Sequence, residues 1–222
     1  MSEDKLLQFI TLNFISPSFG HQKLESPTYD DLVDVFEDRI RHWFLKPAER
    51  LLETPACQIA AVALLIAYFE GIAIYLSGED SKNKSFEFFT NGFFKVFAID
   101  HEDKSAYKII TRAIYDQARC GFAHDGMFRN RVFFSDIPSR PLIVSFRKKN
   151  GIIDFSQFES IVINPFRFHE SILIHFEGYI KSLREGSDST LKKAFLNAVK
   201  LKWALDDEAR AIGMTEEEFY GT

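Results

Sequence analysis

One apolar segment, residues 55–76, constrains the fold more than any other part of the chain. Its sequence, PACQIAAVALLIAYFEGIAIYL, contains only two strongly polar side chains, Gln58 and Glu70. A helix of this length spans about 33 Å, which is enough to cross a bilayer. However, its many alanines, the internal Glu70 and the lack of basic flanks favour a helix buried on most sides within a bundle. We therefore expect no membrane span, and we expect the rest of the chain to pack around this segment.

Composition supports one well-packed domain. Of the 222 residues, 46% are hydrophobic and 24 are Phe, which is enough to build a substantial core. A net charge of −5 argues against a broadly basic, DNA-coating protein, but it leaves room for a local nucleic-acid site. Cys57 and Cys120 form no CxxC pair, so we predict neither a disulfide nor a metal site. The N-terminus lacks a signal-peptide pattern, and we expect a cytoplasmic protein.

Helical periodicity recurs on both sides of the apolar segment. Apolar residues at three- and four-residue spacings predict helices over about 29–52, 86–97, 105–122, 165–184 and 189–205. Pro47 predicts a kink or break in the first of these helices. The Phe-rich stripe of 86–97 is typical of core packing rather than of a base-stacking platform.

After the helix predicted at 105–122 and before the one at 165–184, the pattern changes to short β-branched or aromatic runs. Strands are predicted at 132–135, 142–146, 152–155 and 160–163, with a tight hairpin turn at Asn150-Gly151. These runs predict a small antiparallel sheet inserted into the bundle. Arg147, Lys148 and Lys149 precede the turn, and a solvated hairpin tip is favoured there over a phosphate contact.

The predicted fold class is therefore mainly α, a helical bundle with a small antiparallel β-sheet or hairpin insertion. Residues 1–222 form a single domain. Its parts are an N-terminal arm (1–27), the helical bundle (28–127 and 164–206), the β insertion (130–163) and an acidic C-terminal tail (207–222).

The densest candidate chemistry lies in residues 115–131, YDQARCGFAHDGMFRNR. Arg119 is suited to binding a phosphate, and His124 is suited to exchanging protons near neutral pH. On an ideal helix, residues five apart point about 140° away from each other. Gly121 lies between them and permits a distortion that would bring them together. Arg129 and Arg131 follow as candidate contacts to a nucleic-acid backbone.

Glu70 is a further candidate because an acid inside a buried helix needs a partner. A backbone N–H or a lysine of the bundle is one alternative. Arg119 or His124 is the other, and the sequence leaves both open.

The Arg-x4-His string formed by Arg119 and His124, at a helix end inside a helical bundle, resembles the HEPN superfamily (higher eukaryotes and prokaryotes nucleotide-binding). The hallmark of that family is an Arg-x4–6-His motif, and the bundle pattern covers most of the chain, without the sheet insertion. The residue after the Arg is commonly a polar Asn, Asp or His in active members, whereas this chain has Cys120.

The resemblance implies metal-independent RNA cleavage, without a cofactor, at a site built by two protomers of a homodimer. His124 would act as general acid or base, Arg119 would stabilise charge on the phosphate, Glu70 would orient either residue, and Arg129 and Arg131 would hold the RNA. It also implies a toxin or defence role with an antitoxin or other regulatory partner. The alternative is a catalytically inactive HEPN-like module that binds a protein or a nucleotide. The chain has no phosphate-cradling Gly-rich loop, Gly-x-Ser-x-Gly or His-Glu-x-x-His pattern to support another enzyme class.

Overall fold

The computed structural model of the chain describes residues 15–99 and 104–203. The predicted acidic tail and the first fourteen residues of the predicted arm lie outside the described residues.

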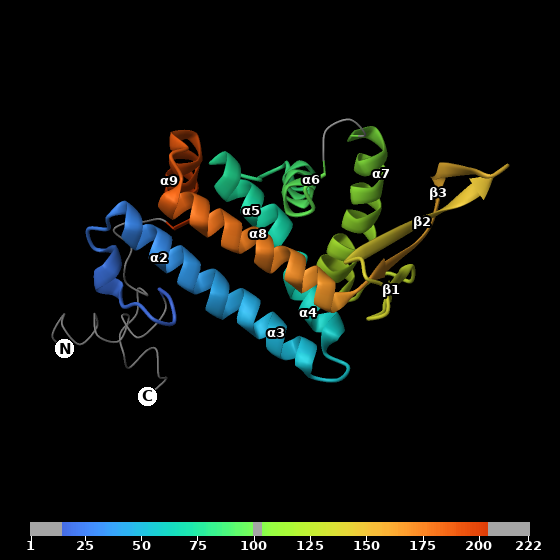
Figure 1. Ribbon diagram of the computed structural model, residues 1–222, viewed down its shortest axis with the longest axis horizontal. Helices are drawn as coiled ribbons and strands as arrows, with labels where there is room; N and C mark the ends of the chain where they lie inside the picture. The colour runs from blue at the N-terminus through green and yellow to red at the C-terminus, as the bar shows by residue number, and fades with distance from the viewer. Residues whose placement is uncertain (1–14, 100–103, 204–222) are drawn as a thin grey trace.

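Helices dominate the described part of the chain, and a small sheet projects from one end, as the sequence predicts (Figure 1). In chain order the helical elements are η1 (His21–Leu24), α2 (Tyr29–Ile40), η2 (Arg41–Leu45), α3 (Lys46–Glu53), α4 (Gln58–Leu65), α5 (Tyr68–Ser77), α6 (Ser85–Val96), α7 (Lys104–Ile114), η4 (Tyr115–Arg119), η5 (Gly121–Asp125), α8 (Pro165–Glu185) and α9 (Ser189–Trp203). The strands are β1 (Val132–Phe134), β2 (Leu142–Lys149) and β3 (Ile152–Ile163).

The first long helix begins with a capping box, in which Thr28 and Asp31 each bond the other's backbone N–H. It does not break at Pro47. Instead the chain widens into the π-helical turn η2, whose final bond runs from the N–H of Lys46 to the carbonyl of Arg41, five residues earlier. The extra residue in this turn lets the helix continue into α3. Pro47 lies in the first turn of α3, where the missing N–H of the proline costs little.

The apolar segment forms two helices, α4 and α5, separated by a turn at Ile66 and Ala67. By length and composition, Gln58–Ser77 is long and apolar enough to cross a membrane, and 56% of its 18-residue apolar window is buried inside the fold. Its buried side chains include Val62, Leu65 and Phe69, which belong to the main core cluster. Its packing is that of a core helix, with α5 between α6 and α9 and α4 against α8.

Phe69 lies at the centre of an aromatic core. Its ring contacts Phe89 and Phe93 of α6, each with centroids 5.3 Å away, and Phe168 of α8 at 5.6 Å. The Phe-rich stripe of α6 therefore packs in the core, as predicted. Gly92 on the same helix allows this contact, because a Cβ at that position would lie 1.9 Å from the carbonyl oxygen of Phe69.

The sheet confirms the predicted hairpin but corrects the prediction that it is wholly antiparallel. β2 and β3 are antiparallel, and Asn150 (φ 52) and Gly151 (φ 80) form their turn with the left-handed backbone that such a turn requires. The two runs predicted at 152–155 and 160–163 form one strand, β3. β1 pairs with the other edge of β3, so the order is β1-β3-β2 and the β1–β3 pair is parallel.

This arrangement has a packing reason. Ile161 and Ile163 of β3 are fully buried, so the end of β3 that contains them needs a neighbour on both edges. The side chain of Asn164, which caps α8, also bonds the carbonyls of Asp136 and Pro138 and ties the β1–β2 connection to the start of that helix.

Replacing Gly92 by Ala tests the α5–α6 contact. In an unhindered helix this change stabilises by up to about 1 kcal/mol. Here the new Cβ forces the two backbones apart, and we expect a loss of about 2–4 kcal/mol in the free energy of unfolding, measured by chemical denaturation. Gly178→Ala in α8 is the matched control, because nothing lies within 4 Å of a Cβ there. Equal stabilities for the two variants would contradict the close approach.

Candidate functional site

The helix that carries Arg119 extends past its predicted end at residue 122. α7 continues through the π-helical turns η4 and η5 as far as Asp125, and Gly126 ends it with a left-handed φ of 72°. π turns occur mostly as single turns inside α-helices and often at functional sites. Gly121 does not end the helix, but the helix is distorted on both sides of it. The 140° offset that an ideal helix would impose on Arg119 and His124 therefore does not apply.

Gly121 also lets the following chain fold back onto the helix. A Cβ at this buried position would lie 3.0 Å from the carbonyl of Met127 and from Cγ of Arg129. The backbone N–H of Arg129 then donates to the carbonyl of Gln117 at 3.1 Å. This bond fixes the loop beside the π-helical part of the helix.

Arg119 is held at the edge of the bundle by Glu70. Its Nη2 donates to Oε2 of Glu70 at 3.1 Å, and the two side chains are 28% and 17% exposed. The structure thus selects Arg119 as the partner of Glu70 from the alternatives that the sequence left open. The guanidinium also lies 5.4 Å from the ring of Tyr115, in the preceding turn.

Tyr115 is a residue of the site that the sequence analysis missed. Its ring packs against Phe86 and Phe89 of α6, at 5.3 and 5.2 Å between centroids, and so connects Arg119 to the aromatic core. Burial raises the pKa of Tyr115, although Arg119 acts in the opposite direction, so the phenol stays neutral. Its position four residues before an arginine is the signal that would have identified it.

His124 lies at the exposed end of the same helix. It makes no hydrogen bond or ion pair with any residue in the described ranges. Arg119 and His124 are therefore brought into one distorted helical segment, but each has its own surroundings: the first is half-buried and paired, and the second is open to solvent.

The two predicted backbone-binding arginines lie on the loop that folds back. Arg129 forms an ion pair with Asp125 at 3.0 Å, with both side chains close to half exposed. Nη1 of Arg131 donates to the carbonyl oxygen of Phe158 in β3 at 2.5 Å, and its guanidinium lies 5.7 Å from the Phe158 ring. Arg131 thus links the helix end to the β insertion.

The sequence analysis missed an acid–histidine pair formed by Asp38 and His42. Nδ1 of His42 lies 2.8 Å from Oδ1 of the buried Asp38, one helical turn earlier. Asp38 also accepts from the backbone and hydroxyl of Ser18. Burial acts to raise the pKa of Asp38, but hydrogen bonds from Ser16 and Ser18 outweigh it and lower that pKa. Asp38 therefore anchors the N-terminal segment on α2.

Of the two histidines of α8, His169 is buried and His175 is half-buried. Nε2 of His169 is buried and has no hydrogen-bond partner among the described residues. Nδ1 of His175 lies 3.0 Å from the hydroxyl of Tyr68, and burial, with a smaller contribution from Lys95, lowers the pKa of His175 to about 4. Within the described residues, no group of three or more His, Cys, Asp or Glu side chains is placed to hold a metal ion.

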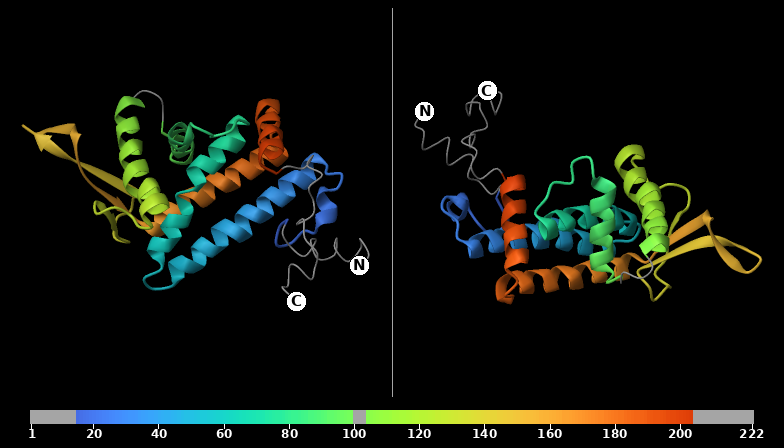
Figure 2. Two further views of the ribbon diagram at one scale, coloured as in Figure 1. Left: turned by 180° about the vertical axis from the view of Figure 1, so that it is seen from behind. Right: turned by 90° about the horizontal axis from the view of Figure 1, so that it is seen from above.

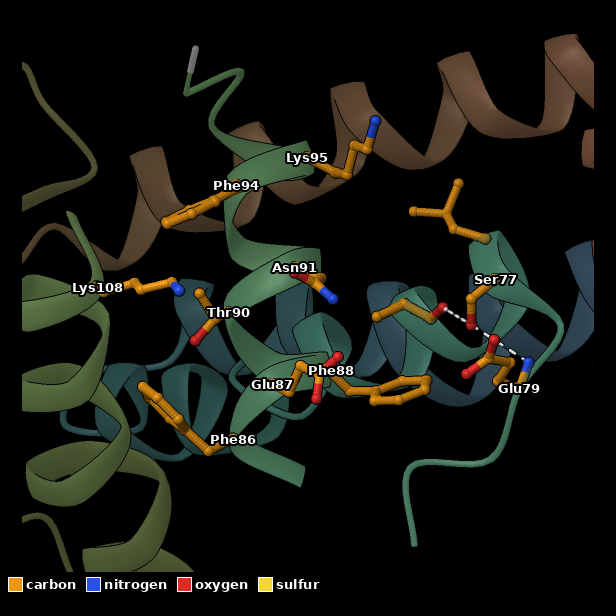
Figure 3. A pocket seen from close by; sticks show the side chains of 12 residues that line it. Ser77, Glu79, Phe86, Glu87, Phe88, Thr90, Asn91, Phe94, Lys95 and Lys108 are labelled. Carbon is orange, nitrogen blue, oxygen red and sulfur yellow. Dashed lines mark hydrogen bonds between the residues drawn. The ribbon is translucent and has the colours of Figure 1, made fainter. Parts of the chain in front are cut away.

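A cavity of about 760 Å³ opens between α5, α6 and α7, but it does not contain Arg119 or His124 (Figure 3). Two lysines (Lys95 and Lys108) and two acids (Glu79 and Glu87) line it together with apolar side chains. These charges balance, so the cavity favours neither an anionic nor a cationic ligand.

No protein-family model matches the chain, and neither does any curated protein or solved structure. The resemblance to the HEPN superfamily therefore stays a prediction that rests on Arg119, His124 and their helical setting.

The lowered pKa of His175 makes the stability of the fold dependent on pH. In the unfolded chain the imidazole titrates near 6.5, and in the folded protein near 4, so the unfolded state binds more protons between these values. The stability is fully present above about pH 6.5 and falls as the pH drops towards 4. We expect His175 to account for about 2–3 kcal/mol of this loss.

The measurement compares the wild-type protein with His175→Gln by chemical denaturation at about pH 7.5 and about pH 4.5. Glutamine cannot take up the proton, so the stability of the variant relative to the wild type should rise by that amount at the lower pH. A difference between the two proteins that is the same at both pH values would contradict the assignment to His175.

Proposed function

We propose that the chain is a metal-independent, HEPN-like ribonuclease in which Arg119 and His124 are the catalytic residues. The observation that carries the proposal is the ion pair of Arg119 with Glu70, which holds a half-buried guanidinium at the bundle edge, five residues before the exposed His124. The π turns in this segment support it, because such turns often occur at functional sites.

The chemistry assigned to these residues is attack by the RNA 2′-hydroxyl on the adjacent phosphorus. One imidazole accepts the hydroxyl proton, the new P–O2′ bond forms, the P–O5′ bond breaks, and a protonated imidazole donates to the leaving 5′ oxygen. In a homodimer the two copies of His124 supply one base and one acid. Arg119 stabilises the negative charge that builds up on the phosphoryl oxygens. The products are a 2′,3′-cyclic phosphate and a 5′-hydroxyl, and DNA is not cleaved because it lacks the nucleophile.

A catalytically inactive module that binds a protein or a nucleotide is the second candidate. Two observations favour it: Cys120 follows Arg119 where active relatives commonly have a polar residue, and Glu70 already neutralises the charge of Arg119. The toxin or defence role and an antitoxin or other regulatory partner belong to the proposal and rest on the resemblance alone. The cytoplasmic location also belongs to the proposal and rests on the sequence pattern.

Incubation of the purified protein with RNA in EDTA separates the two candidates. We expect cleavage by the wild type, and a loss of at least about 100-fold in rate for both Arg119→Ala and His124→Ala, because general acid–base and charge-stabilising groups each contribute about that much. End-group analysis of the fragments should find the cyclic phosphate.

Arg112→Ala is the matched control for these variants. Arg112 lies on the same helix, is 55% exposed and pairs with Asp116, so its removal changes the net charge as Arg119→Ala does and leaves the Arg119–Glu70 pair in place. Cleavage that persists in all three variants would indicate a contaminant. No cleavage by the wild type would leave the inactive module as the function of this fold. A mass in solution of 25.7 kDa, rather than twice that value, would exclude the homodimer.

Glu70→Gln tests the positioning role of the acid separately. The amide keeps the size of the side chain but loses the charge that holds Arg119, so we expect the turnover rate to fall by about tenfold while the KM for RNA changes little. Thermal unfolding of the same sample checks that the bundle remains folded. Faster cleavage by Glu70→Gln would contradict positioning and show that the acid suppresses the site.

A further inference from the structure

The outer part of the β2–β3 hairpin projects beyond the body of the protein (Figures 1 and 2). Near the bundle, β2 and β3 pair in regular register, and the third strand of the sheet, β1, pairs with residues 161–163 of β3 only. Further out, the register shifts after Ser145 and again after Phe146, where β3 contains the additional residues. Asp154 and Ser156 form a local turn there through two hydrogen bonds to Oδ1 of Asp154.

The irregular part of the hairpin gathers aromatic side chains. The ring of Phe146 contacts Phe155 at 5.2 Å and Phe158 at 6.0 Å between centroids, both edge to face. Phe155 is 38% exposed, and Ile153, near the tip, is 50% exposed. Phe146 and Phe158 are half-buried, and Phe158 packs against the main core, so Phe155 and Ile153 are the apolar side chains that this part of the hairpin presents to solvent.

Positive charge lies beside this cluster. Arg147 is paired with Glu159 at 3.1 Å, but Lys148 and Lys149 are exposed and form no ion pair with any residue that the structure describes. Arg131 adds a third cation from the loop after the candidate site, since its guanidinium lies over Phe158. The sequence favoured a merely solvated tip, because the aromatic cluster beside these charges could not be seen in the strand pattern.

The hairpin is also continuous with the candidate site. The loop from Gly126 is fixed to the site helix by the Arg129–Gln117 backbone bond and to the hairpin by the bond of Arg131 to Phe158. The loop after the candidate site is therefore bonded both to the helix that carries Arg119 and His124 and to the hairpin.

We propose that the hairpin segment 146–158 binds single-stranded RNA, with phosphates on Lys148 and Lys149 and a base stacked on Phe155. This inference deepens the proposed function and rests on it for the choice of RNA. Charge complementarity selects the occupant: phosphates neutralise the two lysines, whereas a second copy of the hairpin would place like charges against each other. Exposed aromatic rings next to cations are the combination that holds single strands, because every base has a face that stacks.

The test measures binding to a fluorescein-labelled oligouridylate by fluorescence anisotropy, in EDTA and on the His124→Ala background so that the RNA stays intact. We expect Phe155→Ala to weaken binding by about tenfold. For Lys148→Ala/Lys149→Ala, we expect weaker binding and a slope of log affinity against log salt that is shallower by about 1.4, which corresponds to two lost phosphate contacts on a single strand.

Lys193→Ala/Lys200→Ala is the matched control. It also removes two positive charges, from exposed lysines of α9 at the far end of the molecule (Figure 1), which pair with no acid in the described part of the chain. If both double variants lose affinity equally, or if neither does, the hairpin is not the binding surface. Equal binding of oligodeoxythymidylate would keep the surface but assign it to single strands in general, and stronger binding of duplex RNA would overturn the proposal.

The outcomes also separate this inference from the proposed function. Hairpin-dependent binding by a wild-type protein that cleaves nothing would refute the nuclease and retain the RNA-binding surface. Cleavage by a protein whose binding does not depend on the hairpin would do the reverse.

Discussion

The burial of α4 and α5 is the constraint on which the rest of the structure depends. This pair of helices is too apolar to face water, and the remaining helices cover it: α6 and α9 pack on α5, and α3 and α8 pack on α4. The aromatic ring of Phe69 is fully buried at the centre, and the carbonyl of the same residue lies so close to Gly92 that the α5–α6 contact is set at backbone level. Every other helix has to fit around this contact.

The same constraint determines where the candidate site lies. Glu70 follows Phe69 directly on α5, so the burial of Phe69 brings its carboxylate into the bundle. A carboxylate in that position is costly unless a cation pairs with it. Arg119 meets it because Tyr115, one turn earlier, is packed against Phe86 and Phe89 of α6. The position of the guanidinium thus follows from core packing, whereas His124, beyond the packed part of the helix, is free of it.

α8 completes the bundle by surface charge rather than by core contacts alone. It runs antiparallel to α2 (Figure 1), and Arg184 reaches Asp34 and Glu37 while Arg41 reaches Glu177. Exposed pairs of this kind contribute little individually. Together, however, they fix how α8 lies along α2. Because α8 starts at the end of β3, they also fix the position of the β insertion.

How much of this was predictable depends on whether the deciding interaction is local. The helices and the Asn150-Gly151 turn were predicted, because each depends on residues a few positions apart. The parallel β1–β3 pair and the ion pair of Glu70 with Arg119 join distant residues, and one sequence gives no means of choosing among partners. The π turns escaped for a different reason: they insert one residue into an otherwise regular helix and leave the apolar pattern nearly unchanged. The Asp38–His42 pair, at a spacing of four, was readable and was missed.

The charges around the candidate site cancel in pairs, and this cancellation bears on how a phosphate would be held there. Arg119 is paired with Glu70 and Arg129 with Asp125, whereas Arg131, Lys148 and Lys149 have no acidic partner among the described residues. A guanidinium has five N–H donors, and the bond to Glu70 uses one of them, so Arg119 can still bind a phosphate. It offers that phosphate directed hydrogen bonds but little net charge. Long-range attraction must therefore come from the unpaired cations of the loop and hairpin. The hairpin would attract a polyanion, and the fixed Arg119 would orient one of its phosphates.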